Sequence, residues 1–228
     1  MNIGIDIDGV LTNFERELLD YATKMCVEEN WPIKIKLDEY DEEKGLGWNE
    51  EQTMKFWHKY LIKYFSETPV RTFAPEVIEK LRQEGHRIYI ITARNNYGIP
   101  KEHYGKEQEI TRKWLDYNNI KYTKLIFAKD EDKIKQCIEN EVDIMIEDSP
   151  KNIENISKQI KVIKFDCQYN KDVNNENVTT AYSWYHIYRI IKQMKGDQLW
   201  KVNRKIKNFF KFFHRKKVNF NNRFLMFF

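Results

Sequence analysis

Two aspartates separated by one residue follow an apolar run near the start of the chain. In residues 3–7 every second position is isoleucine, so a strand here would carry its isoleucines on one face. Asp6 and Asp8 would then lie on the other face, at the carboxyl end where α/β sheets place their chemistry. Two carboxylates on one side repel each other, which predicts a divalent cation beside them. An Asp-x-Asp-Gly turn closing an edge strand is the alternative.

A second group of polar residues closes the apolar run 87–91. Thr92 ends this run and is followed by Ala93 and Arg94. A hydroxyl at the end of a strand can donate a hydrogen bond to a phosphate oxygen, and so can the neighbouring backbone N–H groups. A threonine that merely closes a strand is the alternative. Arg94 could contact phosphate or substrate, or face solvent.

A lysine follows the next apolar run, residues 124–128. The charged segment behind it contains Lys129 and Lys133. Either lysine could neutralise a phosphate and the crowded aspartates. The competing interpretation is a solvated charge cluster at the start of a helix.

An acidic pair closes the apolar run 143–146. Glu147 and Asp148 follow it directly, and acidic side chains at the end of a buried strand are costly unless a cation is present. The pair therefore supplies candidate metal ligands. Asp148 or Ser149 could also cap a helix that has Pro150 at its first position, and both interpretations can hold together.

In this order, the four motifs resemble those of the haloacid dehalogenase (HAD) superfamily of phosphohydrolases, over roughly residues 1–170. The segment from Asp6 to Thr12 resembles the first motif and Thr92 the second. The third and fourth are represented by Lys133, with Lys129 as the alternative, and by Glu147-Asp148. The segment from Asp6 to Glu15, the helical insert behind it and Ile146-Glu147-Asp148 resemble the 5'(3')-deoxyribonucleotidase branch, which includes bacterial nucleotidases.

The resemblance implies a Mg²⁺-dependent phosphomonoesterase. Asp6 would be the nucleophile and form an aspartyl-phosphate, which splits one hard step into two. Asp8 would protonate the leaving oxygen and later activate water. Mg²⁺ would be held by Asp6, the backbone carbonyl of Asp8, and Asp148.

The resemblance also implies how the phosphate is held. Thr92, Ala93 and Lys133 would bind it, Glu147 would anchor Lys133, and Arg94 would support the site. The mammalian nucleotidases carry a second small hydroxyl residue where this chain has Ala93, which leaves the substrate open. A (deoxy)nucleoside monophosphate is the first expectation. Alternatives are a sugar phosphate, a terminal phosphate of nucleic acid, or a membrane-associated scaffold with a vestigial phosphatase core.

Strands that alternate with helices predict an α/β domain with a Rossmann-like, three-layer parallel sheet, here the HAD fold. The expected strands after the first are 87–91, 124–128, 143–146 and 160–165. The expected helices are 14–27, 53–65, 75–84, 106–117, 133–140 and 151–156. We assign residues 1–12 and 70–195 to the catalytic core, 13–69 to a small helical cap inserted after the first strand, and 196–228 to a C-terminal tail.

The cap sequence is rich in aromatic side chains. Trp48, Phe56, Trp57 and Tyr60 could stack on a base or sugar, or form the core of the cap itself. His58 is expected on the surface.

The tail differs from the rest of the chain, which has 228 residues and a net charge of +4. Apolar side chains from Leu199 to Phe213 share one helical face opposite a lysine-rich face, which predicts a basic amphipathic helix. Such a helix could dock on the body, pair in a homodimer, lie on an anionic membrane surface, or bind nucleic acid. Three widely spaced cysteines and no apparent secretion signal or membrane-spanning run predict a cytoplasmic protein, with peripheral membrane association as an option.

Overall fold

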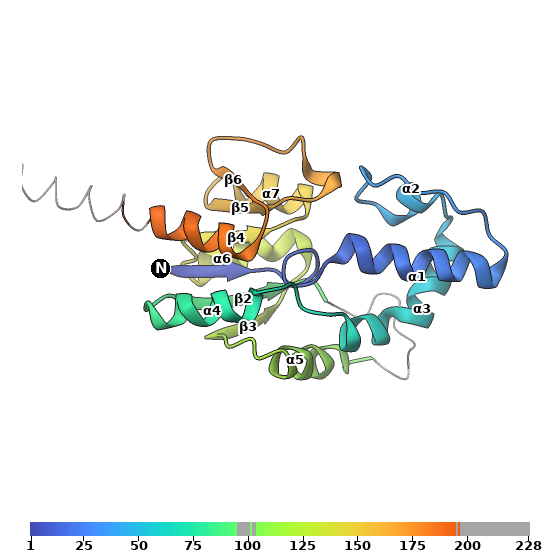
Figure 1. The fold of residues 1–228 in the computed structure, drawn as a ribbon, viewed down its shortest axis with the longest axis horizontal. Coiled ribbons are helices and arrows are strands. Elements are labelled where there is room, and N and C mark those ends of the chain that lie inside the picture. The colour runs from blue at the N-terminus through green and yellow to red at the C-terminus, as the bar shows by residue number, and fades with distance from the viewer. Residues whose placement is uncertain (95–100, 102–103, 195, 197–228) are drawn as a thin grey trace, which may run out of the picture. The chain divides into compact units, whose positions relative to one another are not determined.

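Six parallel strands form a single sheet in the order β3-β2-β1-β4-β5-β6 (Figure 1). The computed structural model describes residues 1–94, 101, 104–194 and 196. The strands are β1 (Asn2–Ile5), β2 (Arg87–Thr92), β3 (Lys124–Phe127), β4 (Ile144–Glu147), β5 (Lys161–Phe165) and β6 (Val178–Ala181). The predicted parallel α/β fold is confirmed, and β6 is an addition to it.

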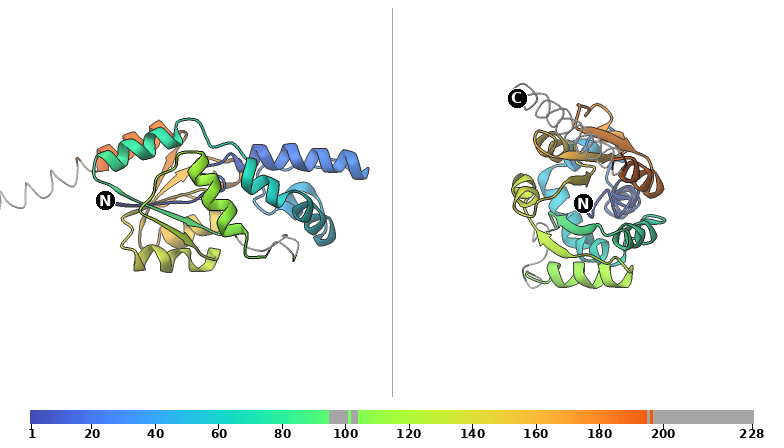
Figure 2. Two further views of the ribbon diagram at one scale, coloured as in Figure 1. Left: turned by 90° about the horizontal axis from the view of Figure 1, so that it is seen from below. Right: turned by 90° about the vertical axis from the view of Figure 1, so that its left-hand side faces the viewer.

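Helices cover both faces of this sheet. Figure 2 shows α4 (Ala74–Gln83) on one face and α6 (Lys133–Glu139) on the other. On the α6 side, Cys137 of this helix and Ile153 of α7 (Pro150–Ile156) join Ile91 and Met145 of the sheet in one buried hydrophobic cluster. Another helix, α5 (Glu107–Tyr117), buries Trp114 and Leu115. The expected helix bounds agree with these to within one or two residues.

A group of helices inserted between β1 and α4 has a hydrophobic core of its own. It consists of α1 (Phe14–Glu29), α2 (Glu42–Leu46) and α3 (Glu50–Glu67), which lie beyond the carboxyl end of β1 (Figure 1). We call residues 13–69 the insert. Its cluster of buried side chains comprises Ala22, Met25, Cys26, Leu46, Trp48, Phe56, Trp57, Tyr60, Leu61, Tyr64 and Phe65.

Local signals in the sequence set the ends of these helices. In α3, Asn49 accepts a hydrogen bond from the backbone N–H of Gln52, whose side chain accepts one from Asn49 in return. α1 ends at Asn30 in the left-handed region, at φ 56°. α2 was not expected, because five residues are too few to show helical periodicity.

The two connections between sheet and insert are tied together. Thr12 and Val70 form an antiparallel bridge, and the backbone N–H of Arg71 donates to Leu11 O at 2.7 Å. The Arg71 side chain donates to the carbonyls of Thr12 (2.9 Å) and Gly9 (3.1 Å). The insert is thereby fastened to the loop that carries the two aspartates.

Residues 1–187 and 188–228 separate into two units. A helix covers residues 184–194. The basic amphipathic helix expected in the tail lies outside the described residues, which include only Gly196 of the tail. Among the described residues, no helix is long and apolar enough to cross a membrane.

Candidate active site

Asp6 lies where the central strand of the sheet ends. Its backbone N–H donates to Ile146 O of β4 at 3.1 Å, one residue beyond the last pair of the β1 ladder. The chain then turns sharply, and the N–H groups of Val10, Leu11 and Thr12 all point to Ile7 O. This turn places the buried Asp6 and the half-buried Asp8 at the carboxyl edge of the sheet.

Lys133 is the lysine that reaches Asp6. Its Nζ lies 2.9 Å from Asp6 Oδ2 and 3.1 Å from Glu147 Oε2, whereas Lys129 is exposed. Burial alone would lower the pKa of Lys133, but the carboxylates of Asp6 and Glu147 raise it well above its usual value. The ammonium is therefore a fixed positive charge beneath Asp6.

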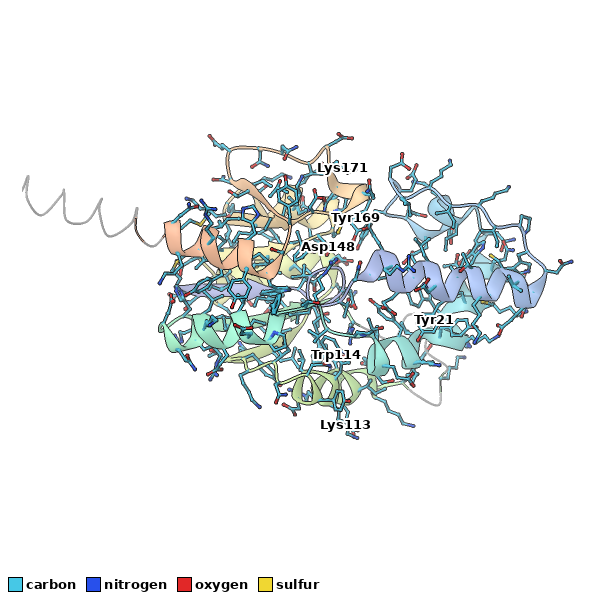
Figure 3. All side chains as sticks on the ribbon, in the orientation of Figure 1. Tyr21, Lys113, Trp114, Asp148, Tyr169 and Lys171 are labelled. Atoms are coloured by element: carbon cyan, nitrogen blue, oxygen red, sulfur yellow. The ribbon has the colours of Figure 1, made fainter. Side chains whose placement is uncertain are left out.

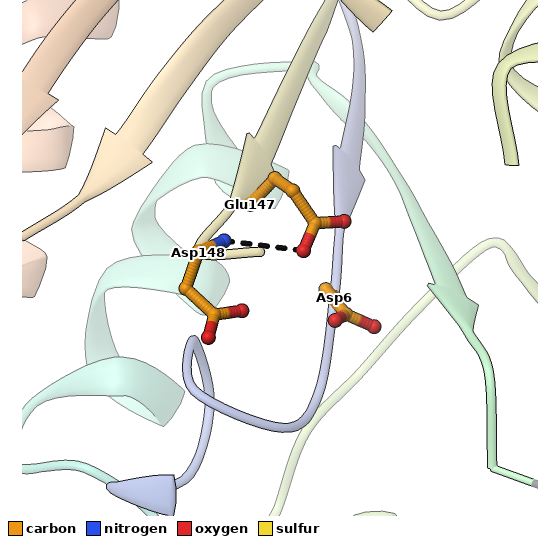
Figure 4. Close-up of side chains that lie close together, drawn as sticks. All are labelled: Asp6, Glu147 and Asp148. Carbon is orange, nitrogen blue, oxygen red and sulfur yellow. Dashed lines mark hydrogen bonds between the residues drawn. The ribbon is translucent and has the colours of Figure 1, made fainter. Parts of the chain in front are cut away.

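Glu147 is fully buried, and contacts within the chain occupy both of its oxygens. Oε1 accepts from the backbone N–H groups of Asp148 and Ser149, each at 3.1 Å, and Oε2 accepts from Lys133. The structure thus shows the contact expected for an anchor of Lys133. Although oxygens of Asp6, Glu147 and Asp148 lie within 4.8 Å of one another (Figure 4), three hydrogen bonds within the chain already use the Glu147 oxygens.

The remaining two carboxylates fit a hard cation. Asp6 Oδ1 is buried and has no hydrogen-bond partner among the described residues. Burial raises the pKa values of Asp6 and Asp148 well above the usual range, with Lys133 acting in the opposite direction on both. Two buried carboxylates are difficult to ionise together unless a cation offsets their charge. Because the donors here are oxygens, Mg²⁺ suits the site.

The loop after β5 makes two hydrogen bonds to Asp148. The Tyr169 hydroxyl donates to Asp148 Oδ2, and Asn170 Nδ2 donates to Asp148 O at 2.7 Å (Figure 3 labels Asp148 and Tyr169). Sequence reasoning missed both residues. The dense run of Asn, Tyr and Asp after Phe165 was the only signal, and it is typical of any turn.

A buried lysine supports the same loop. Lys164 is 2% exposed, and its Nζ donates to the carbonyls of Asn170 (2.8 Å), Val173 (3.0 Å) and Lys171 (3.4 Å). Burial lowers the pKa of its ammonium. This charge is used for structure, because one ammonium joins three carbonyls of the same loop.

Arg94 does not face solvent. Its guanidinium binds Asp8 through Nη2 (2.9 Å to Oδ1) and Nε (3.0 Å to Oδ2). Tyr64, from α3 of the insert, donates to Asp8 Oδ1 at 3.0 Å and also pairs with the Thr12 hydroxyl at 3.2 Å. The sequence offered no signal for Tyr64, which reads as one more aromatic on a helix.

The two residues before Arg94 differ in their surroundings. Thr92 is fully buried, and its hydroxyl accepts from the backbone N–H of Arg94 at 3.3 Å. Ala93 lines the cavity described next. The expected phosphate-binding pair is therefore near the site, and of the two it is Ala93 that borders the open space.

A cavity of about 280 Å³ lies between these residues and the insert. Its charged lining comprises Asp6, Asp8, Glu42, Arg94, Asp130, Lys133 and Asp148. Its apolar and aromatic lining comprises Phe14, Tyr40, Trp57, Leu61, Tyr64, Phe65 and Ala93. Burial raises the pKa of Glu42 to about 7.

Trp48, Phe56, Trp57 and Tyr60 were the aromatic residues that could stack on a ligand or form the core of the insert. All four belong to the buried cluster of the insert, and of them Trp57 also lines the cavity. His58 is exposed, as expected. The four aromatics therefore form the core of the insert, and Trp57 is the one among them that could also contact a ligand.

A family model described as "5' nucleotidase, deoxy (Pyrimidine), cytosolic type C protein" matches residues 1–197. The chain belongs to this nucleotidase family. The HAD resemblance drawn from the four motifs is confirmed, and the protein is a phosphoric monoester hydrolase by family.

Relatives of the nucleotidase family match across most of their length. A Bacillus cereus protein assigned as a nucleotidase is 29% identical over 199 residues, covering 85% of this chain and 99% of its own. A nucleotidase of Clostridium acetobutylicum is 28% identical over 200 residues, covering 85% of this chain and 95% of its own.

Solved structures agree with the fold. A haloacid dehalogenase-like protein of unknown function from Agrobacterium tumefaciens superposes with a TM-score of 0.61 at 13% identity, covering 85% of this chain and 98% of its own. A haloacid dehalogenase-like hydrolase from Streptococcus pneumoniae gives 0.57 at 13% identity, covering 83% and 97%. These likenesses confirm the fold expected for the family.

Proposed function

We propose that the protein is a Mg²⁺-dependent phosphomonoesterase that acts on nucleoside monophosphates through an aspartyl-phosphate. One observation carries the proposal: Asp6 has one carboxylate oxygen on Lys133 and the other without a partner among the described residues, at a cavity of about 280 Å³. A carboxylate held in this way is oriented for attack and needs only a cation to remain ionised.

In the first step, an Asp6 oxygen attacks the phosphorus of the substrate. The bond from phosphorus to the ester oxygen breaks, and that oxygen takes a proton from the Asp8 carboxyl and leaves as the nucleoside. Lys133 lies beside Asp6 and neutralises charge on the transferred group.

In the second step, Asp8 reverses its role. It removes a proton from a water molecule whose oxygen attacks the phosphorus of the aspartyl-phosphate. The bond between phosphorus and the Asp6 oxygen breaks, which releases inorganic phosphate, frees Asp6 and leaves Asp8 protonated again.

Mg²⁺ would be held by Asp6, the Asp8 backbone carbonyl and Asp148. When bound, it supplies positive charge to the phosphate oxygens. Glu147 stays outside this ligand set because Lys133 and two backbone N–H groups use its oxygens. Ala93 would contribute backbone N–H donation to the phosphate, beside Thr92.

Support for a nucleotide comes from the family and from the cavity wall. The relatives above are named as nucleotidases, and the insert contributes Phe14, Trp57 and Tyr40 to the cavity. We assign the insert the role of a cap, because it closes the side of the cavity opposite the sheet. Flat aromatic side chains there suit a base or sugar.

Phosphate release from a panel of nucleoside monophosphates and sugar phosphates tests the proposal, with Mg²⁺ or with EDTA. Wild type should release phosphate only with Mg²⁺, and Asp6→Asn should lose the activity. Asp20→Asn is the matched control, since Asp20 lies on the exposed face of α1 and pairs with Arg16. Release that persists in Asp6→Asn would disprove the mechanism, and a preference for sugar phosphates would disprove the substrate.

A further inference from the structure

Among the described residues, every side-chain hydrogen bond to the Asp8 carboxylate leads to the insert. Tyr64 of α3 donates to Oδ1 directly. Arg94 donates to both oxygens, and with Nη1 it also donates to Phe65 O of α3 at 3.2 Å. The same residue thus holds Asp8 at one edge of its guanidinium and the insert backbone at another.

Arg94 is built into the protein as a fixed part. Its side chain is 0% exposed. The centre of its guanidinium lies 4.4 Å from the Phe65 ring and 5.2 Å from the Trp114 ring. A guanidinium is rigid and planar. Because it binds both the Asp8 carboxylate and Phe65 O, it fixes the distance between them. The position of the Asp8 carboxylate is therefore set by the end of α3.

The anchor at the end of α3 is itself held by the core. Trp114 of α5 donates its indole N–H to Thr68 O, directly after α3, at 2.7 Å. Trp114 is labelled in Figure 3. The end of α3 cannot drift without breaking a buried hydrogen bond, which costs about 1–3 kcal/mol.

We propose that Arg94 and Tyr64 are positioning residues for proton transfer. They hold Asp8 Oδ1 and leave Oδ2, which among the described residues accepts only from Arg94 Nε, as the oxygen that carries the proton to the leaving group. Phosphate binding is left to the groups around Asp6. The inference rests on the proposed function. It gives Arg94 the role of positioning Asp8, although its place next to Ala93 would favour a contact with phosphate. All three nitrogens of the guanidinium already donate to Asp8 or to Phe65 O.

The test compares two substrates in Arg94→Lys. A nucleoside 5'-monophosphate loses an alkoxide and needs a proton from Asp8, whereas 4-nitrophenyl phosphate loses a stable phenolate and does not. Lysine keeps the positive charge but cannot hold Asp8 and Phe65 O together. We expect kcat/KM for the nucleotide to fall on the order of 100-fold. For 4-nitrophenyl phosphate, kcat/KM, which reports the first step, should fall less than about 10-fold, and KM should not rise for either substrate.

Tyr64→Phe provides a second variant that keeps the ring in the insert core. It removes one hydrogen bond to Asp8 and should give the same substrate-dependent loss at smaller size. Tyr60→Phe is the matched control, because Tyr60 lies one turn earlier on α3 and binds Glu28. In the double variant of Arg94 and Tyr64, the losses should not add, since both residues act on one carboxylate.

Three results would overturn the inference. A KM that rises equally for both substrates in Arg94→Lys would show that Arg94 binds the phosphate. An equal fall in kcat/KM for both substrates with a lowered Tm would show a merely structural role. A wild type without Mg²⁺-dependent release would disprove the proposed function and the inference with it, and the same assay separates that failure from the first two.

Discussion

Gly9 brings the two halves of the candidate metal site into contact. It adopts a φ of +80°, and a Cβ built there would lie 1.8 Å from Asp148 Oδ2. Gly85 has a similar φ of +83°, but a Cβ there would meet nothing within 4 Å. The two glycines therefore share one conformational requirement and differ in whether a side chain would collide with a functional group.

Alanine at these positions separates strain from collision. Both Gly9→Ala and Gly85→Ala should lower the free energy of unfolding by about 1–2 kcal/mol for the left-handed conformation. Only Gly9→Ala should also abolish phosphate release, because Asp148 must move away. Urea unfolding and phosphate release measure the two effects, and an active Gly9→Ala would contradict the argument.

At the level of residues, the sequence predicted which side chains gather at the strand ends but not every contact that they make. Asp6, Asp8, Lys133, Glu147 and Asp148 were expected because their spacing follows strand ends. The choice between Lys133 and Lys129 depends on where the helix begins. The pairing of Arg94 with Asp8 depends on tertiary packing against α3, which no local pattern encodes.

The element that most depends on a single side chain is the β5–β6 connection. It carries Tyr169 and Asn170 to Asp148, and the Lys164 ammonium holds its carbonyls. This connection and β6 were missed, because a polar run of Asn and Asp lacks the apolar alternation by which strands are recognised. The long predicted helices were recovered, since each repeats its apolar face over several turns.

Lys164→Met should destabilise the protein by about 3 kcal/mol, because carbonyls that lose a charged donor stay buried. Lys161→Met is the control on the same strand, where the side chain is exposed; it should change stability by less than about 0.5 kcal/mol. Urea unfolding at neutral pH measures both. Equal stabilities of the two variants would show that the loop does not need the ammonium.

On the scale of the whole molecule, the fold concentrates acidic groups at one end of the sheet. Burial raises the pKa values of Asp6 and Asp148, so the folded protein binds protons there more strongly than the unfolded chain. Their contribution to stability is therefore greatest at acidic pH and falls as pH rises from the ordinary carboxyl pKa toward the raised values. A bound cation reverses this trend, because it requires ionised ligands.

The thermal shift produced by Mg²⁺ should accordingly grow with pH. At a Mg²⁺ concentration roughly 100 times its Kd, we expect Tm to rise by about 5 °C near neutral pH and by much less near pH 5. Asp148→Asn should remove the shift, whereas Asp20→Asn should keep it. Calorimetry with and without Mg²⁺ at both pH values decides, and a shift independent of pH would argue against carboxylate ligation.

The central place of β1 also governs the order in which the protein can mature during synthesis. Ile3 pairs with Ile88 on one side and with Ile144 on the other. The nascent chain therefore carries an apolar segment that must wait for partners made much later, and such long-range pairing folds slowly and is prone to aggregation. On the ribosome, Asp6 stays without its metal-site partner until Asp148 has emerged, so hydrolytic activity begins only after most of the chain has been translated.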